Sequence, residues 1–464
     1  MPNMSLKKNE MPSQAPDVRN KNFLEVALGY TEEQALDEAQ RCLHCKNKPC
    51  VAGCPVGIHI PDFIAKVAEG GFLRGPIRLS PSRAPCPPCA AGCAPRRPSA
   101  SRSAYGASRG SRWALAAWNG SWPTGTTRTS ARRPASPPPN GHKVAVIGSG
   151  PSGLTCAGDL AKKGYAVTVF EALHTAGGVL VYGIPEFRLP KDIVQKEIDG
   201  LKALGVDVQT NMVIGRVLSI DELLEQGYEA VFIGSGAGLP RFMNIPGENL
   251  KGVYSANEFL TRVNLMKAYQ PGSDTPIEHA RRVAVVGGGN VAMDAARCAK
   301  RLGAEEVFIV YRRSEKELPA RAEEVEHAKE EGIVFHLLNN PTQILGDENG
   351  NVKGMECIRM ELGEPDASGR RRPVEVPGSE FTLDVDCVIM AIGTSPNPLI
   401  KSTTQGLETQ KWGGIIVNEE TGLTSREGVY AGGDAVTGAA TVILAMGAGK
   451  TAATAIDEYI QSKA

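Results

Sequence analysis

The sequence lacks any apolar run near the roughly 20 residues that a helix needs to span a bilayer. Its first residues are polar and contain no short apolar core of the kind found in a secretory signal peptide. The 11 cysteines therefore point to a reducing compartment, where grouped cysteines bind metals rather than form disulfides. We expect a cytoplasmic protein with no membrane partner.

Negatively charged residues are absent from a long stretch of the chain. Residues 70–142 contain no Asp, Glu or Lys, but they hold 11 Arg, 12 Pro and three of the four Trp. The whole chain carries 51 basic and 51 acidic residues, so the rest of it has a net charge of −11. This acidic balance argues against nucleic acid as a partner. The plainest interpretation of the stretch itself is a disordered basic linker.

The genetic code offers a second interpretation of this stretch. The reading frame can be shifted by joining the third base of each codon to the first two bases of the next codon. With suitable synonymous codons, residues 111–125 then encode PVGIGSLERFVADW. Tryptophan has a single codon, so the G, E and A that derive from Trp113, Trp118 and Trp122 are forced. The same shift over residues 84–104 permits CGRVCPQ and then two further cysteines. We infer that residues 74–133 are translated out of frame and replace a helical segment with four cysteines, which makes Cys86, Cys89 and Cys93 accidental.

Residues 142–171 carry a dinucleotide-binding fingerprint in its required order of strand, glycine turn, helix and strand. The glycines allow a tight turn, a close approach of the backbone to a pyrophosphate and packing of the helix on the strand. The N-terminus of the helix offers N–H donors to the phosphates. Glu171 ends the second strand, where it is placed to accept a hydrogen bond from a ribose hydroxyl. The turn consists of Gly148, Gly150, Pro151, Ser152 and Gly153.

Later segments are expected to complete this first nucleotide site, which we assign to FAD. They are glycine-punctuated loops that follow apolar strands or approach the nucleotide closely, and a helix whose N-terminus faces the flavin ring. Asp434 is expected to hold a ribityl hydroxyl, although a helix cap is the alternative. The residues assigned here are Gly178, Arg188, Gly234, Gly236, Gly393, Gly433, Asp434, Thr441 and Val442.

A second glycine turn predicts a second nucleotide site. An apolar strand at 282–286 leads into GGGNVA and a helix, but the next strand ends in Tyr311-Arg312-Arg313 rather than in an acid. Arginines at this place suit the 2′-phosphate of NADPH. The residues assigned to NADPH are Gly287, Gly289, Asn290, Val291, Ala292, Arg312 and Arg313. The sequence has no cysteine between Cys156 and Cys298, so it lacks the redox pair of a thioredoxin reductase.

The N-terminal part predicts a metal site. Residues 30–41 read as a helix with a capping box at Thr31 and Gln34. Four cysteines follow with the spacing C-x2-C-x4-C-x3-C-P, which suits an iron–sulfur cluster and less well a structural zinc. These ligands are Cys42, Cys45, Cys50 and Cys54.

Several stretches resemble the glutamate synthase small (β) subunit family. They are CLHCKNKPCVAGCPVGIHIPDFI, VIGSGPSGL, YGIPEFRLPK, GGGNVAMDAAR with YRRS, and VYAGGDAVTG. The recoded PVGIGSLERFVADW is similar to this family too, and the resemblance covers nearly the whole chain except residues 74–133. It implies two [4Fe–4S] clusters completed by a second cysteine group. That group is missing as written, so one or two clusters are expected, with the second in doubt.

The resemblance implies an α/β protein with two Rossmann-like domains after a helical iron–sulfur domain. The expected boundaries are 1–140 for the iron–sulfur domain, 141–264 and 381–464 for the two parts of the FAD domain, and 265–380 for the NADPH domain. The same scaffold is shared by the large subunit of NADH-dependent ferredoxin:NADP oxidoreductase, by sulfide dehydrogenase subunits and by part of dihydropyrimidine dehydrogenase.

We expect an NADPH-dependent oxidoreductase of the glutamate synthase type. Electrons pass from NADPH through FAD to the clusters, and no protein acid or base is assigned because the cofactors carry the chemistry. The implied partner is a glutamate synthase large subunit, or another flavoprotein or ferredoxin, within an oligomer. The alternatives are a subunit of an electron-bifurcating transhydrogenase or sulfide dehydrogenase, and a non-catalytic nucleotide sensor with structural zinc.

Overall fold

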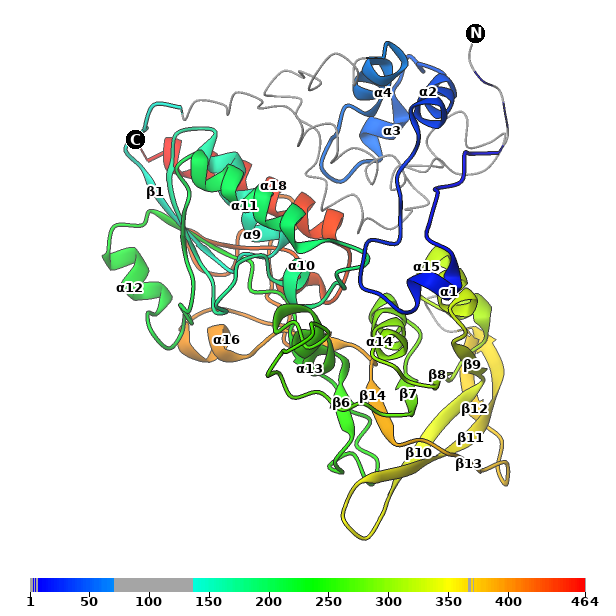
Figure 1. The fold of residues 1–464 in the computed structure, drawn as a ribbon. Coiled ribbons are helices and arrows are strands. Elements are labelled where there is room, and N and C mark those ends of the chain that lie inside the picture. The colour runs from blue at the N-terminus through cyan, green and yellow to red at the C-terminus, as the bar shows by residue number, and fades with distance from the viewer. Residues whose placement is uncertain are drawn as a thin grey trace.

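The protein is described by a computed structural model at residues 7–70, 137–365 and 371–463 and at positions 3, 5 and 369. The described chain forms two parallel five-stranded sheets, a four-stranded antiparallel sheet, a two-stranded antiparallel sheet and an N-terminal group of helices (Figure 1). The predicted fold class, two Rossmann-like sheets after an N-terminal helical domain, is confirmed. The out-of-frame stretch proposed at 74–133 lies outside the described residues.

The first sheet is built around the strand that precedes the first glycine turn. Its order is β16-β4-β1-β2-β3, and all neighbouring strands are parallel. The strands are β1 (Lys143–Ile147), β2 (Ala166–Phe170), β3 (Asp207–Gln209), β4 (Ala230–Ile233) and β16 (Val429–Ala431). The helices associated with this unit are α9 (Pro151–Ala161), α10 (Val179–Tyr182), α11 (Lys191–Ala203), α12 (Ile220–Glu225), α16 (Leu399–Thr403), α17 (Asp434–Thr437) and α18 (Val442–Gln461).

The second sheet repeats this plan around the second glycine turn, with the order β6-β14-β7-β8-β9. Its strands are β6 (Val253–Ser255), β7 (Arg282–Val286), β8 (Glu306–Tyr311), β9 (Val334–Leu337) and β14 (Cys387–Met390). The unit also contains α13 (Ala256–Leu260), the π-helix η4 (Thr261–Leu265), α14 (Asn290–Arg301), the 3-10 helix η5 (Glu315–Glu317) and α15 (Ala322–Glu330).

The second unit extends beyond the predicted 265–380 on both sides. Strand β14 lies between β6 and β7 and hydrogen-bonds to both, so residues 253–255 and 387–390 belong to the second sheet. The chain crosses between the two units where β5 (Leu239–Pro240) pairs with β15 (Thr394–Ser395). Strand β14 was expected to return to the flavin domain, but that return begins only after this crossing.

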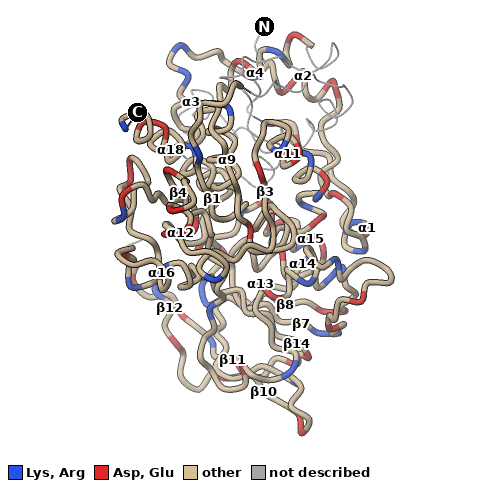
Figure 2. Tube along the Cα trace, turned by 90° about the vertical axis from the view of Figure 1, so that its left-hand side faces the viewer, with Lys and Arg blue, Asp and Glu red and all other residues tan. Residues whose placement is uncertain are grey.

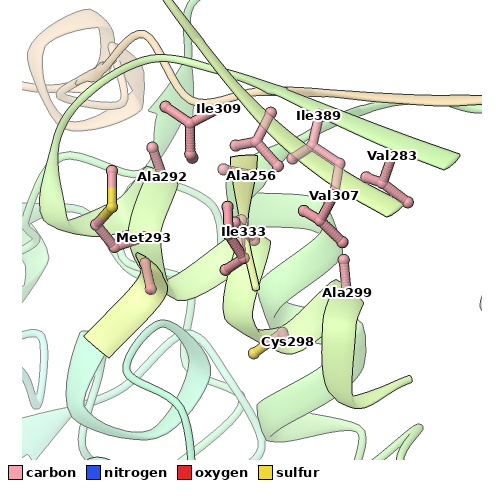
Figure 3. Packing of buried hydrophobic residues seen from close by; sticks show 14 of the residues in the cluster. Ala256, Val283, Ala292, Met293, Cys298, Ala299, Val307, Ile309, Ile333 and Ile389 are labelled. Carbon is pink, nitrogen blue, oxygen red and sulfur yellow. The ribbon is translucent and has the colours of Figure 1, made fainter. Parts of the chain in front are cut away.

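Small residues let α14 pack closely on the second sheet. The helix is rich in fully buried alanines, which bring its axis near the strands. Figure 3 shows this packing, with Ala292, Met293, Cys298 and Ala299 against Val283, Val307, Ile309 and Ile389. The core therefore holds the start of α14, and with it the second glycine turn, at a fixed place on the sheet.

The remaining described elements are the N-terminal helices and the antiparallel sheet (Figure 1). The N-terminal helices are α1 (Pro16–Arg19), α2 (Glu32–Gln40), α3 (Pro49–Ala52) and α4 (Ile60–Ala68). The capping box predicted at Thr31 and Gln34 is confirmed at the start of α2. The antiparallel sheet comprises β10 (Asn339–Gly346), β11 (Val352–Pro365), β12 (Arg371–Glu375) and β13 (Phe381–Leu383).

Charges of both signs are interspersed over the described chain (Figure 2). Within that part of the chain, no helix is both long and apolar enough to cross a membrane.

Candidate active site

A single cavity of about 1540 Å³ connects the two glycine turns. Its size exceeds the roughly 300–1,000 Å³ of a pocket for one small molecule, so it can take more than one nucleotide. Most of the residues predicted for FAD line it, namely Gly148, Gly150, Pro151, Ser152, Glu171, Gly178, Arg188, Gly234, Gly236, Gly393, Asp434, Thr441 and Val442. Those predicted for NADPH that line it are Gly287, Gly289, Asn290, Val291, Arg312 and Arg313.

Three predicted residues do not line the cavity and instead serve packing. A Cβ atom on Gly153 would lie 1.9 Å from the carbonyl oxygen of Gly148, so the absence of a side chain lets α9 rest on its strand. Gly433 packs against Ser152, and Ala292 is fully buried on the core side of α14.

The two glycine turns have the same construction. Gly150 is the N-cap of α9 and Gly289 is the N-cap of α14, and neither helix start has a side-chain cap. An ideal Cβ on either glycine would meet no atom within 4 Å. Each turn therefore leaves open space in front of the first N–H groups of a helix, which is the arrangement that binds a pyrophosphate.

Glu171 lines the cavity, and its carboxylate also accepts hydrogen bonds from the first glycine turn. Its Oε2 accepts hydrogen bonds from the Ser149 hydroxyl and, at 3.0 Å, from the Ser149 N–H. Its Oε1 accepts from the Leu173 N–H at 2.8 Å. The carboxylate is thus held in one orientation at the cavity wall, as binding of a ribose hydroxyl requires.

Asp434 and Thr441 lie where the chain returns to the first sheet. Burial raises the pKa of Asp434 above its ordinary value, against the hydrogen bond from the Ala440 N–H. Tyr182 also faces this region, and burial together with the charges of Asp434 and Glu171 raises its pKa to about 12. Thr441 is the N-cap of α18, and its Oγ1 is buried with no hydrogen-bond partner among the described residues. An unsatisfied hydroxyl beside a helix N-terminus fits a polar flavin ring.

The two arginines after β8 differ in solvent exposure. Arg312 is exposed at the cavity, whereas the Arg313 side chain is buried and its Nε donates to the Arg371 carbonyl oxygen at 2.9 Å. Asn290 also has a partner, because its Oδ1 accepts from the Arg321 N–H at 2.9 Å. The arrangement presents two positive side chains beside a helix N-terminus and suits a phosphate-bearing ribose.

Arg188 occupies an unexpected position. It was predicted to bind FAD, and it lines the cavity, but its guanidinium also forms ion pairs with Asp294 of α14 and Glu324 of α15. The sequence reasoning missed Asp294, which lies one helical turn after Asn290 on the face of α14 that reaches the cavity. The usable signal was a charged residue within the alanine-rich face of a helix that was expected to be buried.

The four predicted cysteine ligands lie around α3 and its flanking loops, all half-buried and free of disulfides. Burial and neighbouring thiols raise the pKa values of Cys42 and Cys50, and Cys45 contributes to both shifts. Among the residues that the structure describes, no three side chains of His, Cys, Asp or Glu are grouped closely enough to hold a metal ion. Four thiols in this short segment still offer the soft donors that an iron–sulfur cluster takes.

The cysteine segment touches the first nucleotide-binding unit directly. Pro55 contacts Gly447 of α18, and Val56 packs against the hydrophobic cluster that includes Val442 and Met446 of the same helix. Val442 also lines the cavity. One helix therefore adjoins both the candidate flavin position and the segment after Cys54.

Comparisons with protein families also divide the chain into a nucleotide-binding part and a cysteine-rich part. Residues 142–458 match the family described as pyridine nucleotide-disulphide oxidoreductase. Residues 19–97 match the family described as dihydropyrimidine dehydrogenase domain II, 4Fe-4S cluster. These matches identify an FAD- and NAD(P)H-binding part and a 4Fe-4S cluster part.

Relatives of several names are similar to the chain. It is 42% identical over 437 residues to the NADP(+)-dependent formate dehydrogenase subunit beta of Moorella thermoacetica, which covers 89% of this chain and 60% of that one. The chain thus spans less than two thirds of this relative's length. It is 34% identical over 476 residues to the glutamate synthase [NADPH] small chain of Azospirillum brasilense, covering 98% of this chain and 95% of the relative.

A solved structure shares the fold of the nucleotide-binding part. FprA from Mycobacterium tuberculosis in complex with NADPH superposes with a TM-score of 0.58 at 22% identity, covering 69% of this chain and 85% of that chain. The nucleotide-binding sheets, the cluster segment and the relatives of matching length lead to one conclusion. The chain belongs to the pyridine nucleotide-disulphide oxidoreductase family, within its branch of NAD(P)H-dependent flavin and iron–sulfur oxidoreductases that includes glutamate synthase small chains.

Proposed function

We propose that this protein is the electron-input subunit of a glutamate synthase. In this role it takes hydride from NADPH at the second glycine turn and delivers electrons to a larger partner that forms L-glutamate. The observation that carries the proposal is the single cavity lined by both glycine turns, which allows two nucleotides to meet. The coverage of 95% of the Azospirillum brasilense small chain supports the choice of partner.

The residues divide the work between two cofactors. FAD is held by the turn at 148–153, Glu171 and the start of α18, and NADPH by the turn at 287–292 with Arg312 and Arg313. When bound, the flavin supplies the conversion of a two-electron hydride into single electrons. The protein contributes position: the Ser149 N–H holds the Glu171 carboxylate at the cavity wall, and the pKa of Tyr182, raised to about 12, keeps its hydroxyl protonated near neutral pH.

Cys42, Cys45, Cys50 and Cys54 are proposed as ligands of an iron–sulfur cluster. The contact of Pro55 with Gly447 supports electron passage from the first unit to this segment, because α18 adjoins both places. The number of clusters, one or two, depends on the reading frame of residues 74–133. The proposal includes an oligomer with the large subunit.

Reconstitution with a glutamate synthase large subunit tests the proposal. The purified chain alone should oxidise NADPH with an artificial dye as the acceptor. With the large subunit, NADPH oxidation should become dependent on both glutamine and 2-oxoglutarate and should yield glutamate. Dye reduction without any glutamine-dependent rate would contradict the glutamate synthase role and leave the oxidoreductase activity standing.

A second candidate follows from the 42% identity to a formate dehydrogenase subunit beta. In that role the chain would exchange electrons between NADP(H) and a partner dehydrogenase. Co-purification of the native chain with its partner separates the two candidates, since a glutamine-hydrolysing subunit supports the first and a formate-oxidising subunit the second.

A further inference from the structure

A buried ion pair joins the two nucleotide-binding units beside the cavity. The Arg188 Nη1 atom lies 2.6 Å from Asp294 Oδ1 and 2.7 Å from Asp294 Oδ2. The two side chains are only 9% and 6% exposed, and both residues line the cavity. Arg188 belongs to the loop before α11 in the first unit, whereas Asp294 lies on the helix that begins at the second glycine turn. The pair therefore joins the first unit directly to the helix that begins at the second glycine turn.

A second carboxylate holds the same guanidinium. Arg188 Nε lies 3.1 Å from Glu324 Oε1, and the other oxygen of Glu324 accepts from Arg297 Nη1 at 2.6 Å. Burial opposes ionisation of Glu324, but Arg188 and Arg297 together lower its pKa to about 2. Arg188 thus forms ion pairs with two helices of the second unit, which fix the orientation of its guanidinium as well as its position.

The residue before Arg188 also contacts α14. The Phe187 ring is fully buried, and its centroid lies 4.8 Å from Arg297 Cζ and 3.8 Å from Arg301 Cζ. Such cation–π contacts are favourable when they are shielded from water. Because Arg297 and Arg301 both belong to α14, two consecutive residues of the first unit are attached to one helix of the second.

The N-terminal segment covers this attachment from outside. The Val26 N–H donates to the Phe187 carbonyl oxygen at 2.9 Å, and Arg19 Nε lies 2.9 Å from Glu331 Oε1. Glu331 in turn accepts from Arg297 and Arg301. Figure 1 shows α1 beside α15, on the side of the molecule where this network lies.

A network of buried charges is a costly way to gain stability. Apolar side chains of similar volume often stabilise a protein as well as or better than a buried ion pair, whereas charged pairs demand one particular geometry. That demand matters here because hydride transfer requires the two reacting rings to be placed accurately, and a displacement of about 1 Å can cost roughly 100-fold in rate. The location of the pair on the cavity wall indicates a role in orientation.

We propose that Arg188 and Asp294 are positioning residues that lock the nicotinamide-binding unit onto the flavin-binding unit in the orientation for hydride transfer. This inference rests on the proposed hydride transfer from NADPH to FAD. Neither residue exchanges a proton or an electron. Their ion pair sets the angle and separation of α14, and hence of the nucleotide at its N-terminus, relative to the first glycine turn.

Shape-conserving variants test the positioning role. Arg188→Gln and Asp294→Asn should each lower the rate constant of flavin reduction at saturating NADPH by about tenfold or more, while the Kd for NADP+ changes less than about twofold. The double variant should be no slower than the slower single variant, because both remove one interaction. Arg188→Lys, which keeps the charge, should recover part of the rate. Amide hydrogen exchange in peptides 184–190 and 290–301 should be faster in each of these variants than in the wild type.

Two further variants and a wild-type control complete the test. Arg281→Gln removes an exposed ion pair with Glu305 inside the second unit and should leave the rate constant unchanged. Arg188→Met with Asp294→Leu removes both charges, so it avoids an unpaired buried charge and should fold while remaining slow. Unchanged flavin reduction in folded, FAD-loaded Arg188→Gln, or a loss explained wholly by weaker NADP+ binding, would overturn the positioning role. Failure of wild-type FAD to be reduced by NADPH would instead overturn the proposed function.

Discussion

A Cβ atom on Gly447 would lie 2.9 Å from the carbonyl oxygen of Pro55. Gly447 belongs to α18, whose first residues line the cavity, and Pro55 directly follows the cysteine at position 54. The contact is backbone against helix, so a side chain could be accommodated only by displacing the cysteine segment. This single close approach connects the cluster segment with the flavin side of the cavity.

Gly447→Ala should loosen the cysteine segment without disturbing the nucleotide sites. The added methyl group forces the segment around Pro55 outward, and overpacking of this kind costs about 1–3 kcal/mol. Faster hydrogen exchange in residues 49–60, with unchanged flavin reduction by NADPH, is the expected result. Gly200→Ala is the matched control, because this residue is exposed on α11 and its Cβ meets nothing within 4 Å. That control should stabilise the protein by about 0.4–1 kcal/mol, and equal exchange in both variants would refute the contact.

The two turn glycines predict separable losses of cofactor. Gly150→Ala and Gly289→Ala each place a methyl group in open space at the start of a helix, so both variants should fold normally. The first should lose FAD and keep binding of NADP+, and the second should keep FAD and bind NADP+ at least about tenfold more weakly, or roughly 1.4 kcal/mol. Flavin content after desalting and NADP+ titration measure the two effects. Loss of FAD in both variants would show that the two turns do not serve separate nucleotides.

Arg312 is predicted to distinguish NADPH from NADH. It is exposed at the cavity, so Arg312→Gln removes a positive charge without leaving a buried group unpaired. A charge-assisted hydrogen bond is worth about 1.5–3 kcal/mol, so kcat/KM for NADPH should fall by about 10- to 100-fold. The value for NADH should change little. Arg282→Gln, which removes a half-buried arginine paired with Glu306 and Asp384 at the other end of the sheet, serves as the control. A parallel loss with both nucleotides would argue against recognition of the 2′-phosphate.

These predictions depend on features that the sequence reveals to different degrees. The glycine turns, the capping box and the helices around them are local patterns, and the structure places them as expected. Strand β14 was assigned to the wrong unit because four apolar residues do not specify which sheet they join. Arg188 was assigned only to FAD because its partners lie 106 and more residues away, and no local periodicity reports such a distant contact.

Glu331 should make stability depend on acid pH. Burial opposes its ionisation, but hydrogen bonds from Arg301 and the charge of Arg297 lower its pKa from 4.5 to about 2. A lowered folded-state pKa contributes stability that is complete above about pH 4.5 and is lost as the pH falls toward 2. Glu331→Gln should therefore destabilise the protein by about 3–5 kcal/mol at neutral pH, because buried arginines lose their partner.

Urea unfolding of wild type and Glu331→Gln between neutral pH and pH 2 checks this prediction. The difference between the two proteins should shrink as the pH falls below 4.5. Glu305→Gln, which alters an exposed pair with Arg281, should match the wild type throughout. A difference that stays constant with pH would mean that the charge of Glu331 does not stabilise the network.

The gene itself should show a reading-frame slip. If residues 74–133 are out of frame, sequencing across codons 70–145 should find a single-base change near codon 74 and its compensation near codon 133. The corrected chain should contain the four additional cysteines and should hold more iron and sulfide per protein than the chain as written. The nucleotide sites lie after this stretch, so NADPH-dependent dye reduction should be equal in both proteins. An intact frame that matches the present sequence would reject the slip and would make Cys86, Cys89 and Cys93 genuine residues of the chain beside the four cysteines of residues 42–54.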